Sequence, residues 1–124
     1  MIALDTSSLI AFLNGERGRD VESIDRALER GQAALPPVVV TEVLSNPRLE
    51  AQLSRLILAL PVLELHPGYW ERAAATRAAV LSRRLRARLA DTLISQSCID
   101  HRVPLITRDR DFAHFVKHAG LTVI

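Results

Sequence analysis

Two acidic residues of this chain lie in surroundings where a carboxylate is unusual. Glu42 stands within the apolar segment Val38–Leu44, and Asp91 stands within Leu89–Ile94. Burying an unpaired carboxylate is costly, so an acid in such a segment usually has a partner or binds a metal. Both residues are therefore candidates for a functional site.

Three further acids follow short apolar runs that are typical of strands. Asp5 comes directly after Met1–Leu4, and Asp109 and Asp111 come shortly after Val103–Ile106. In an open parallel sheet, ligands bind beyond the carboxyl ends of the strands. These acids are therefore expected at the edge of the sheet where a site would form.

If Asp5, Glu42, Asp91 and Asp109 converge, their like charges require protons or cations to offset them. Carboxylate oxygens select hard cations such as Mg²⁺ or Mn²⁺, and the single cysteine disfavours zinc. One or two such cations can activate water for in-line displacement at a phosphodiester. The four carboxylates together therefore favour metal-dependent phosphate hydrolysis.

Each acid also has a simpler structural explanation. Asp5 and Asp91 can be helix N-caps, and Asp109 and Asp111 can be turn residues. Glu42 can be the salt-bridge partner of an arginine. The spatial arrangement of the acids decides between these explanations and a common site.

The elements that must position these acids alternate between strands and helices, as in an α/β domain with a mostly parallel sheet and helices on both faces. The segments expected as strands are Met1–Leu4, Ala33–Leu35, Val62–Leu65, Val103–Ile106 and Leu121–Ile124. The segments expected as helices are Leu9–Leu13, Asp20–Arg30, Val38–Leu44, Arg48–Leu60, Tyr69–Arg86, Leu89–His101 and Phe112–His118.

Length and composition limit the class of protein. The 124 residues fit one domain, with 48% hydrophobic and 24% charged residues, which excludes an intrinsically disordered chain. The lone Cys98 excludes an intramolecular disulfide, and no apolar run approaches the roughly 20 residues of a membrane span. We therefore expect a cytoplasmic protein with no membrane association.

Four segments resemble, in order and spacing, the acidic motifs of PIN domains, and the resemblance covers the whole chain. The segments are Leu4-Asp-Thr-Ser-Ser-Leu-Ile10, Thr41-Glu-Val-Leu44, Leu89-Ala-Asp-Thr-Leu-Ile94 and Leu105-Ile-Thr-Arg-Asp-Arg-Asp-Phe112. The chain is most similar to the single-domain PIN toxins of VapBC-type toxin–antitoxin pairs. Those proteins are Mg²⁺- or Mn²⁺-dependent endoribonucleases inhibited by a cognate VapB-like antitoxin.

The resemblance implies a single PIN domain over residues 1–124, a three-layer α/β/α fold with a four- to five-stranded sheet, and a homodimer. It implies that a quartet of carboxylates binds the metal and catalyses the cleavage of RNA. Asp111 is a fifth acid that can replace or assist the last of the quartet, and two hydroxyls support the site. The quartet is Asp5, Glu42, Asp91 and Asp109, and the supporting hydroxyls are those of Ser7 and Thr107.

A basic stretch precedes the third motif. It contains Arg83, Arg84, Arg86 and Arg88, which can hold RNA phosphates beside an acidic site that would otherwise repel them. A solvated helix end accounts for the same residues equally well. The protein has sixteen basic and fourteen acidic residues, and only Lys117 is a lysine, a bias that base composition of the genome can also produce.

Other classes fit less well. A response-regulator receiver domain needs a pair of acids after its first strand, a phosphoacceptor aspartate and a lysine after its fifth strand, none of which is present. The absence of a glycine-rich phosphate loop excludes a Walker-type nucleotidase. His114 and His118 have helical spacing, but they lack the glutamate and third ligand of a metalloprotease. The remaining alternative is a non-catalytic PIN-like scaffold that binds RNA or a partner without cutting.

Overall fold

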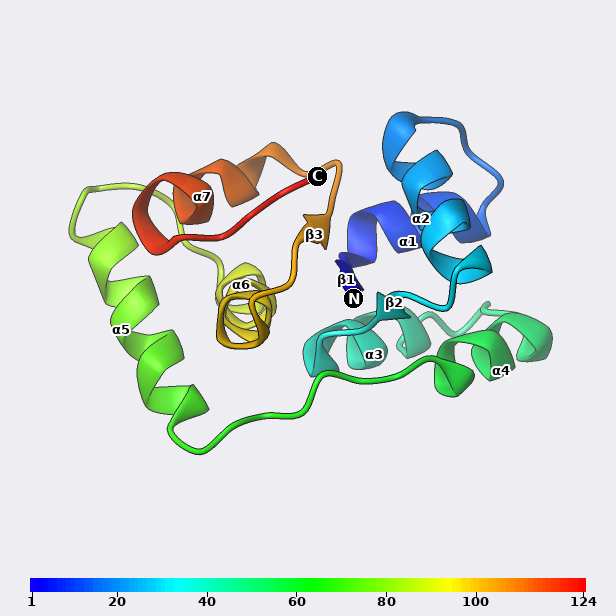
Figure 1. The fold of residues 1–124 in the computed structure, drawn as a ribbon, viewed down its shortest axis with the longest axis horizontal. Helices are drawn as coiled ribbons and strands as arrows, with labels where there is room; N and C mark the ends of the chain where they lie inside the picture. Colours follow the sequence, from blue (N-terminus) through cyan, green and yellow to red (C-terminus); the bar gives the residue numbers. More distant parts are fainter.

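The computed structural model describes residues 1–124 and contains a parallel sheet with the strand order β2-β1-β3 (Figure 1). Its strands are β1 (Ile2–Leu4), β2 (Ala33–Ala34) and β3 (Leu105–Ile106). The register pairs Ala3 with Ala34 on one side and with Leu105 on the other. The strand that comes first in the chain is therefore the central one, and both of its pairings join distant segments.

The segment Val62–Leu65, expected as a strand, makes only one isolated parallel bridge, between Val62 and Leu35. Leu35 is followed by Pro36, which has no backbone N–H to donate, and helix α3 (Pro37–Leu44) begins at the next residue. The ladder therefore ends after a single pair.

The segment Leu121–Ile124 likewise reaches the sheet only through a bridge between Val123 and Leu105. Pro104 precedes β3, and the chain leaves the strand conformation at Thr107, so β3 offers only two residues for pairing. The sheet has three strands, and the expectation of four to five strands is wrong. The parallel direction of the strands and the α/β class are confirmed.

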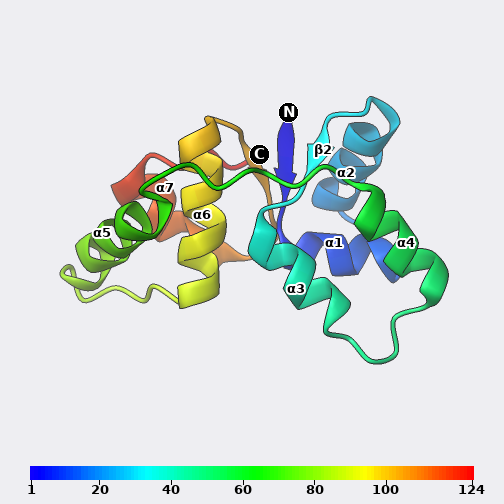
Figure 2. The ribbon, with the colours of Figure 1, turned by 90° about the horizontal axis from the view of Figure 1, so that it is seen from below.

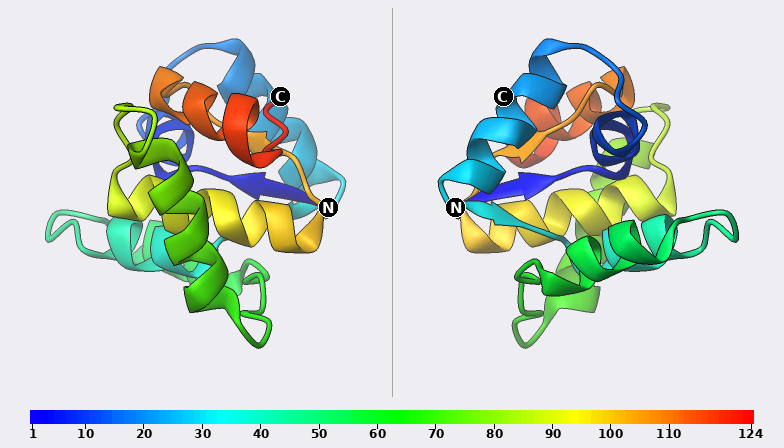
Figure 3. Two further views of the ribbon diagram at one scale, coloured as in Figure 1. Left: turned by 90° about the vertical axis from the view of Figure 1, so that its left-hand side faces the viewer. Right: turned by 90° about the vertical axis from the view of Figure 1, so that its right-hand side faces the viewer.

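Helices cover both faces of the sheet. On one side lie α1 (Thr6–Leu13) and α2 (Arg19–Glu29), and on the other lie α5 (Tyr69–Leu81) and α6 (Leu89–His101) (Figure 1). Figure 2 shows β1 between α2 and α6, and Figure 3 shows β1 running alongside α6. The remaining helices are α3, α4 (Ala51–Ala59), the short 3₁₀ helix η1 (Arg110–Phe112) and α7 (Ala113–Ala119). This is the expected three-layer α/β/α arrangement.

The core is one cluster of 21 buried residues that joins the sheet to both helical layers. Leu4, Leu105 and Ile106 are fully buried, as apolar strands covered on both faces must be. From α6 the core takes Ile94 and Cys98. No helix combines the length and the apolar composition of a membrane-crossing segment.

Helix α5 ends at Leu81, although the sequence favours helix as far as Arg86. Arg84 has a positive φ of 61°, which an L-residue reaches only outside a right-handed helix. Beyond this turn the chain returns to α5, where the Arg77 Nε donates a hydrogen bond to the Ala87 carbonyl at 2.9 Å. The arginine-rich stretch is therefore a loop between α5 and α6, held at its far end.

Candidate functional site

Asp5 lies at the carboxyl end of the central strand, where the sequence analysis places a site. Its backbone N–H donates to the Ile106 carbonyl at 3.0 Å, which fixes Asp5 to the end of β3 as well. The side chain is 3% exposed, and its Oδ2 accepts hydrogen bonds from the hydroxyls of Ser7 at 2.5 Å and Thr107 at 2.7 Å. Asp5 occupies the N-cap position of α1, but its side chain makes no capping hydrogen bond.

Burial raises the pKa of Asp5 above its ordinary value, and the hydroxyls of Ser7 and Thr107 partly offset this by stabilising the anion. Both hydroxyls donate to Oδ2, so neither occupies Oδ1.

Thr107 connects Asp5 to the acids that follow β3. Its Oγ1 donates to Asp5 and accepts from the Asp109 backbone N–H at 3.0 Å. In turn, Asp109 Oδ1 accepts from the Asp111 backbone N–H at 2.9 Å and caps the 3₁₀ helix η1. This hydrogen bond confirms that Asp109 is a turn residue. The same hydrogen bond also fixes the orientation of the Asp109 carboxylate.

Asp91, Asp109 and Asp111 come together. One carboxylate oxygen from each lies within 4.8 Å of the others, and all three side chains are at least partly buried. Asp91 stands in the first turn of α6, three residues after the N-cap Arg88, so it is not itself an N-cap. Its pKa rises to about 6 because of burial first, then because of the nearby charges of Asp109 and Asp5.

Glu42 stands apart from this three-carboxylate cluster. It is exposed on α3, and its Oε1 accepts a hydrogen bond from the Thr6 hydroxyl at 2.7 Å. No arginine forms a salt bridge with it. The hydrogen bond from Thr6 places Glu42 beside the residue that follows Asp5. The other four predicted acids interact with one another through hydrogen bonds or through their charges. These four are Asp5, Asp91, Asp109 and Asp111.

Of the four arginines in the α5–α6 loop, only Arg88 reaches an acid. Its guanidinium lies 3.7 Å from Asp111 Oδ2 and lowers the pKa of Asp91 against the larger opposing effects. The other three, Arg83, Arg84 and Arg86, are exposed and make no salt bridge. One cation therefore borders the cluster, and three more lie in the loop that leads to it.

The structure also gives a role to Arg108, which the sequence patterns do not single out. Its Nε donates to Asp20 Oδ2 at 2.7 Å, and its Nη1 lies 3.2 Å from Glu16 Oε1. These bonds tie the loop after β3 to the start of α2. No local pattern of the sequence marks this residue, because its partners Asp20 and Glu16 lie about 90 positions earlier in the chain.

We expect Asp20→Asn to lower the free energy of unfolding at pH 7 by about 1–2 kcal/mol. The hydrogen bond with Arg108 lowers the pKa of Asp20 from 3.8 to about 2. Ionised Asp20 therefore stabilises the folded state fully above pH 3.8, and this contribution is lost as the pH falls through 2. Urea unfolding at pH 7 and at lower pH should show the difference between the two proteins narrowing toward acid, whereas the exposed control Asp25→Asn should change little at either pH.

The three-carboxylate cluster has the donor chemistry of a hard-cation site. Three carboxylates without histidine or thiolate match the oxygen ligands that Mg²⁺ and Mn²⁺ prefer. Burial raises the pKa of the Cys98 thiol to about 12, so that residue stays protonated and cannot act as a soft ligand. His114 and His118 belong to no comparable group. The residues present therefore fit a divalent metal and do not fit a structural zinc.

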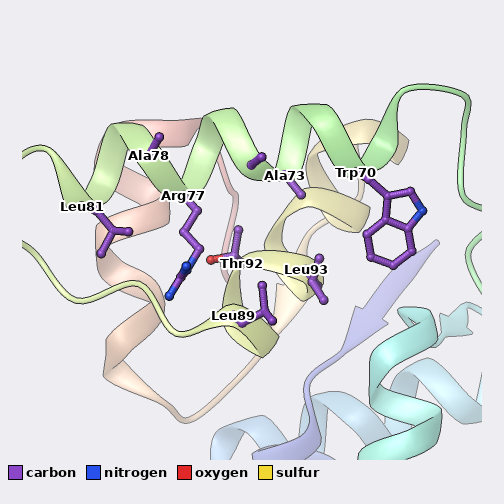
Figure 4. Close-up of a pocket in the computed structure, with 9 residues that line it drawn as sticks. Trp70, Ala73, Arg77, Ala78, Leu81, Leu89, Thr92 and Leu93 are labelled. Atoms are coloured by element: carbon purple, nitrogen blue, oxygen red, sulfur yellow. The ribbon is translucent and has the colours of Figure 1, made fainter.

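A separate hollow of about 420 Å³ lies between α5 and α6 (Figure 4). Trp70 stands at one end of it and Leu81 at the other, Leu89 and Thr92 lie between them, and no carboxylate lines it. Trp70 is 61% exposed, whereas the neighbouring Tyr69 is buried and donates its hydroxyl to the Leu93 carbonyl at 2.7 Å. This hollow has no acid–base group and is not where the candidate chemistry lies.

Comparison with known families places these features in context. The family model described as "PIN domain" matches residues 2–117, and the chain belongs to the PIN domain family. No curated protein matches it in sequence.

Solved structures share the fold. A chain of VapBC2 from Rickettsia felis, crystallised with a DNA fragment from the promoter, is 17% identical, with a TM-score of 0.77 over 100% of this chain and 98% of that chain. A chain of VapBC-5 from Mycobacterium tuberculosis is 21% identical (TM-score 0.68, coverage 99% and 96%), and one of FitAcB from Neisseria gonorrhoeae is 19% identical (TM-score 0.71, coverage 100% and 96%). The VapBC-5 structure is described as a member of the VapBC family of toxin–antitoxin systems.

Proposed function

We propose that this protein is a metal-dependent endoribonuclease that acts as the toxin of a type II toxin–antitoxin pair. The observation that carries the proposal is the convergence of Asp91, Asp109 and Asp111, next to the buried Asp5, in a chain of the PIN domain family. The repulsion among these carboxylates is offset when a cation binds to them. A cation held by carboxylates can catalyse the hydrolysis of a phosphodiester, and RNA is the substrate we propose.

Asp5, Asp91 and Asp109 hold the metal together with Glu42, and Asp111 adds a fifth carboxylate. Bound Mg²⁺ or Mn²⁺ supplies activation of water and compensation of charge on the phosphate oxygens. Ser7 and Thr107 orient Asp5 and stabilise its ionised form through their hydrogen bonds to Oδ2.

Arg83, Arg84, Arg86 and Arg88 attract RNA to a cluster whose own charge would repel it. Three of them are exposed and without salt bridges, and Arg88 already borders Asp111. Each contact between a cation and a phosphate adds affinity that salt weakens.

The toxin role is supported by the shared fold with chains from VapBC structures. It implies a cognate VapB-like antitoxin as partner, a homodimer, and action in the cytoplasm, with residues 1–124 working as one PIN domain. Light scattering of the purified protein tests the homodimer. Growth arrest on induced expression, lost in Asp5→Asn, tests toxicity.

The proposal is tested by incubating the purified protein with total RNA and Mn²⁺ or Mg²⁺. We expect cleavage that disappears in chelator and in Asp5→Asn but persists in Asp25→Asn, which removes an exposed acid far along α2. RNA that is bound but never cut with either metal, over several RNAs, would instead establish the non-catalytic scaffold.

A further inference from the structure

Beside the three-carboxylate cluster lies a groove of about 500 Å³ between η1 and α7. We define this η1–α7 groove by six of its lining residues, which are Thr107, Asp109, Arg110, Val116, Lys117 and Val123. It begins at Thr107 and Asp109, the same residues that connect Asp5 to the cluster. The groove therefore shares Thr107 and Asp109 with the acidic site.

Two of the three cations that line the groove have no partner within the protein. Arg108, also at the groove, is engaged by Asp20 and Glu16. Arg110 and Lys117 are exposed and form no salt bridge or side-chain hydrogen bond within the protein. Two cations without an internal partner thus line a groove that Asp109 of the three-carboxylate cluster also lines.

The groove also offers apolar surface. Val116 is 43% exposed and Val123 is 36% exposed, and both line it. Single-stranded nucleic acid sites combine cations that track the backbone with side chains that contact the faces of the bases, most often aromatic rings. In this groove the exposed apolar groups are the aliphatic side chains of the two valines. An acidic peptide would use the cations alone, because it has no base to place on the two valines.

We propose that the η1–α7 groove is the subsite for the RNA strand next to the bond that is cut. Arg110 and Lys117 contact its phosphates, and Val116 and Val123 receive the face of a base. This inference rests on the proposed function, because a phosphodiester held at the carboxylates leaves the adjoining nucleotides on the surface that begins at Asp109. The η1–α7 groove would then be a second basic surface beside the cluster. The first is the α5–α6 loop, whose Arg88 lies next to Asp111.

The test measures binding of a short fluorescent single-stranded RNA by anisotropy, in EDTA to prevent metal-dependent cleavage. In the double variant Arg110→Gln/Lys117→Gln we expect Kd to rise about tenfold. From roughly 50 to 200 mM salt, the slope of log K against log salt should become shallower by about 1.4, the value for two lost single-strand phosphate contacts.

A matched control removes two other exposed arginines, in Arg30→Gln/Arg55→Gln. Arg30 caps the end of α2 that leads into β2, at the opposite edge of the sheet, and Arg55 lies on α4. The control has the same net charge as the groove variant, so equal losses in both would mean a general effect of charge and overturn the proposal. Melting curves should confirm that both variants remain folded.

Val116→Thr keeps the shape of the side chain and removes an apolar methyl. We expect Kd to rise about two- to threefold with the salt slope unchanged, since no charge is lost. An unaltered Kd would overturn the placement of the base on this surface.

A polyglutamate peptide serves as the second probe. If the groove variant loses affinity for the peptide and keeps its affinity for RNA, the groove is a protein-docking surface and the proposal is wrong. The groove and the proposed function are tested independently, because RNA cleavage is measured with metal and RNA binding is measured without it. A protein that cuts RNA while the groove variant binds normally overturns the groove alone, and one that binds RNA through the groove but never cuts it overturns the nuclease.

Discussion

RNA cleavage should fall about a hundredfold or more when Asp5 is replaced by asparagine, while the protein stays folded. The amide oxygen can accept the hydrogen bonds that Ser7 and Thr107 now donate to Oδ2, so the local packing is kept. What the variant loses is the negative charge and one carboxylate oxygen at the end of β1. Changes even to groups that only support metal ligands commonly cost 10–100-fold, and Asp5 is proposed as a ligand itself.

The measurement compares initial rates of cleavage for the original protein, Asp5→Asn and the exposed-acid control Asp25→Asn at saturating Mn²⁺. Asp5→Ala provides a second comparison, because it leaves the hydroxyls of Ser7 and Thr107 without their acceptor and should lower the melting temperature as well. Full activity in Asp5→Asn, with the protein verified as homogeneous, would remove Asp5 from the proposed site.

Replacing Asp91 by asparagine should lower the activity of the protein and raise its stability. We expect Asp91→Asn to abolish cleavage and yet to stabilise the metal-free protein at pH 7 by about 1–2 kcal/mol, after allowance for solvent screening. The pKa of Asp91 is 3.8 in the unfolded chain and about 6 in the folded protein, because of burial and the charges of Asp109 and Asp5. The folded state therefore binds the proton more tightly, and stability decreases as the pH rises from 3.8 through 6.

At pH 7 the cost of holding a charged Asp91 is fully present, and the asparagine variant avoids it. At pH 5 the original carboxyl is largely protonated in the folded state, so the advantage of the variant should shrink. Mn²⁺ should remove the advantage by a different route, since a cation offsets the repulsion and stabilises only the protein that binds it.

Thermal unfolding of both proteins at the two pH values, in EDTA and in Mn²⁺, distinguishes these contributions. Asp91→Asn that melts below the original protein in EDTA at pH 7 would show that Asp91 is not strained by its neighbours. A rise in melting temperature with Mn²⁺ that is equal in both proteins would show that the metal binds elsewhere.

The acids of the candidate site were predictable because each stands at a position in the sequence where a carboxylate is informative. Asp91 interrupts an apolar segment, and Asp5 and Asp109 follow apolar strands, so burial and sheet topology together imply that they meet. Glu42 shows the same signal but stays exposed on α3, where it accepts a hydrogen bond from Thr6, the neighbour of Asp5. Local sequence identifies an unusual acid, whereas the direction of the side chain depends on the packing of the helix.

The extent of the strands and of α5 was less predictable, since both depend on partners distant in the sequence. Val62–Leu65 alternates like a strand, but the proline after Leu35 leaves it only one residue to pair with. The residues after Leu81 favour helix by propensity, and the contact between Arg77 and Ala87 holds them in a loop instead. In each case tertiary contacts decide between conformations that local propensity ranks closely.

The central position of β1 determines when during synthesis the site can form. The Asp5 carboxylate reaches its hydrogen-bond partner Thr107 across 102 positions of sequence, and the cluster needs Asp109 and Asp111 beyond it. A ribosome therefore synthesises all the intervening residues before Asp5 can meet the last acids, and shorter nascent chains carry the first strand without its neighbour β3. A translation product that stops before Asp111 lacks the assembled site, so the proposed toxicity should arise only from chains that extend beyond this residue.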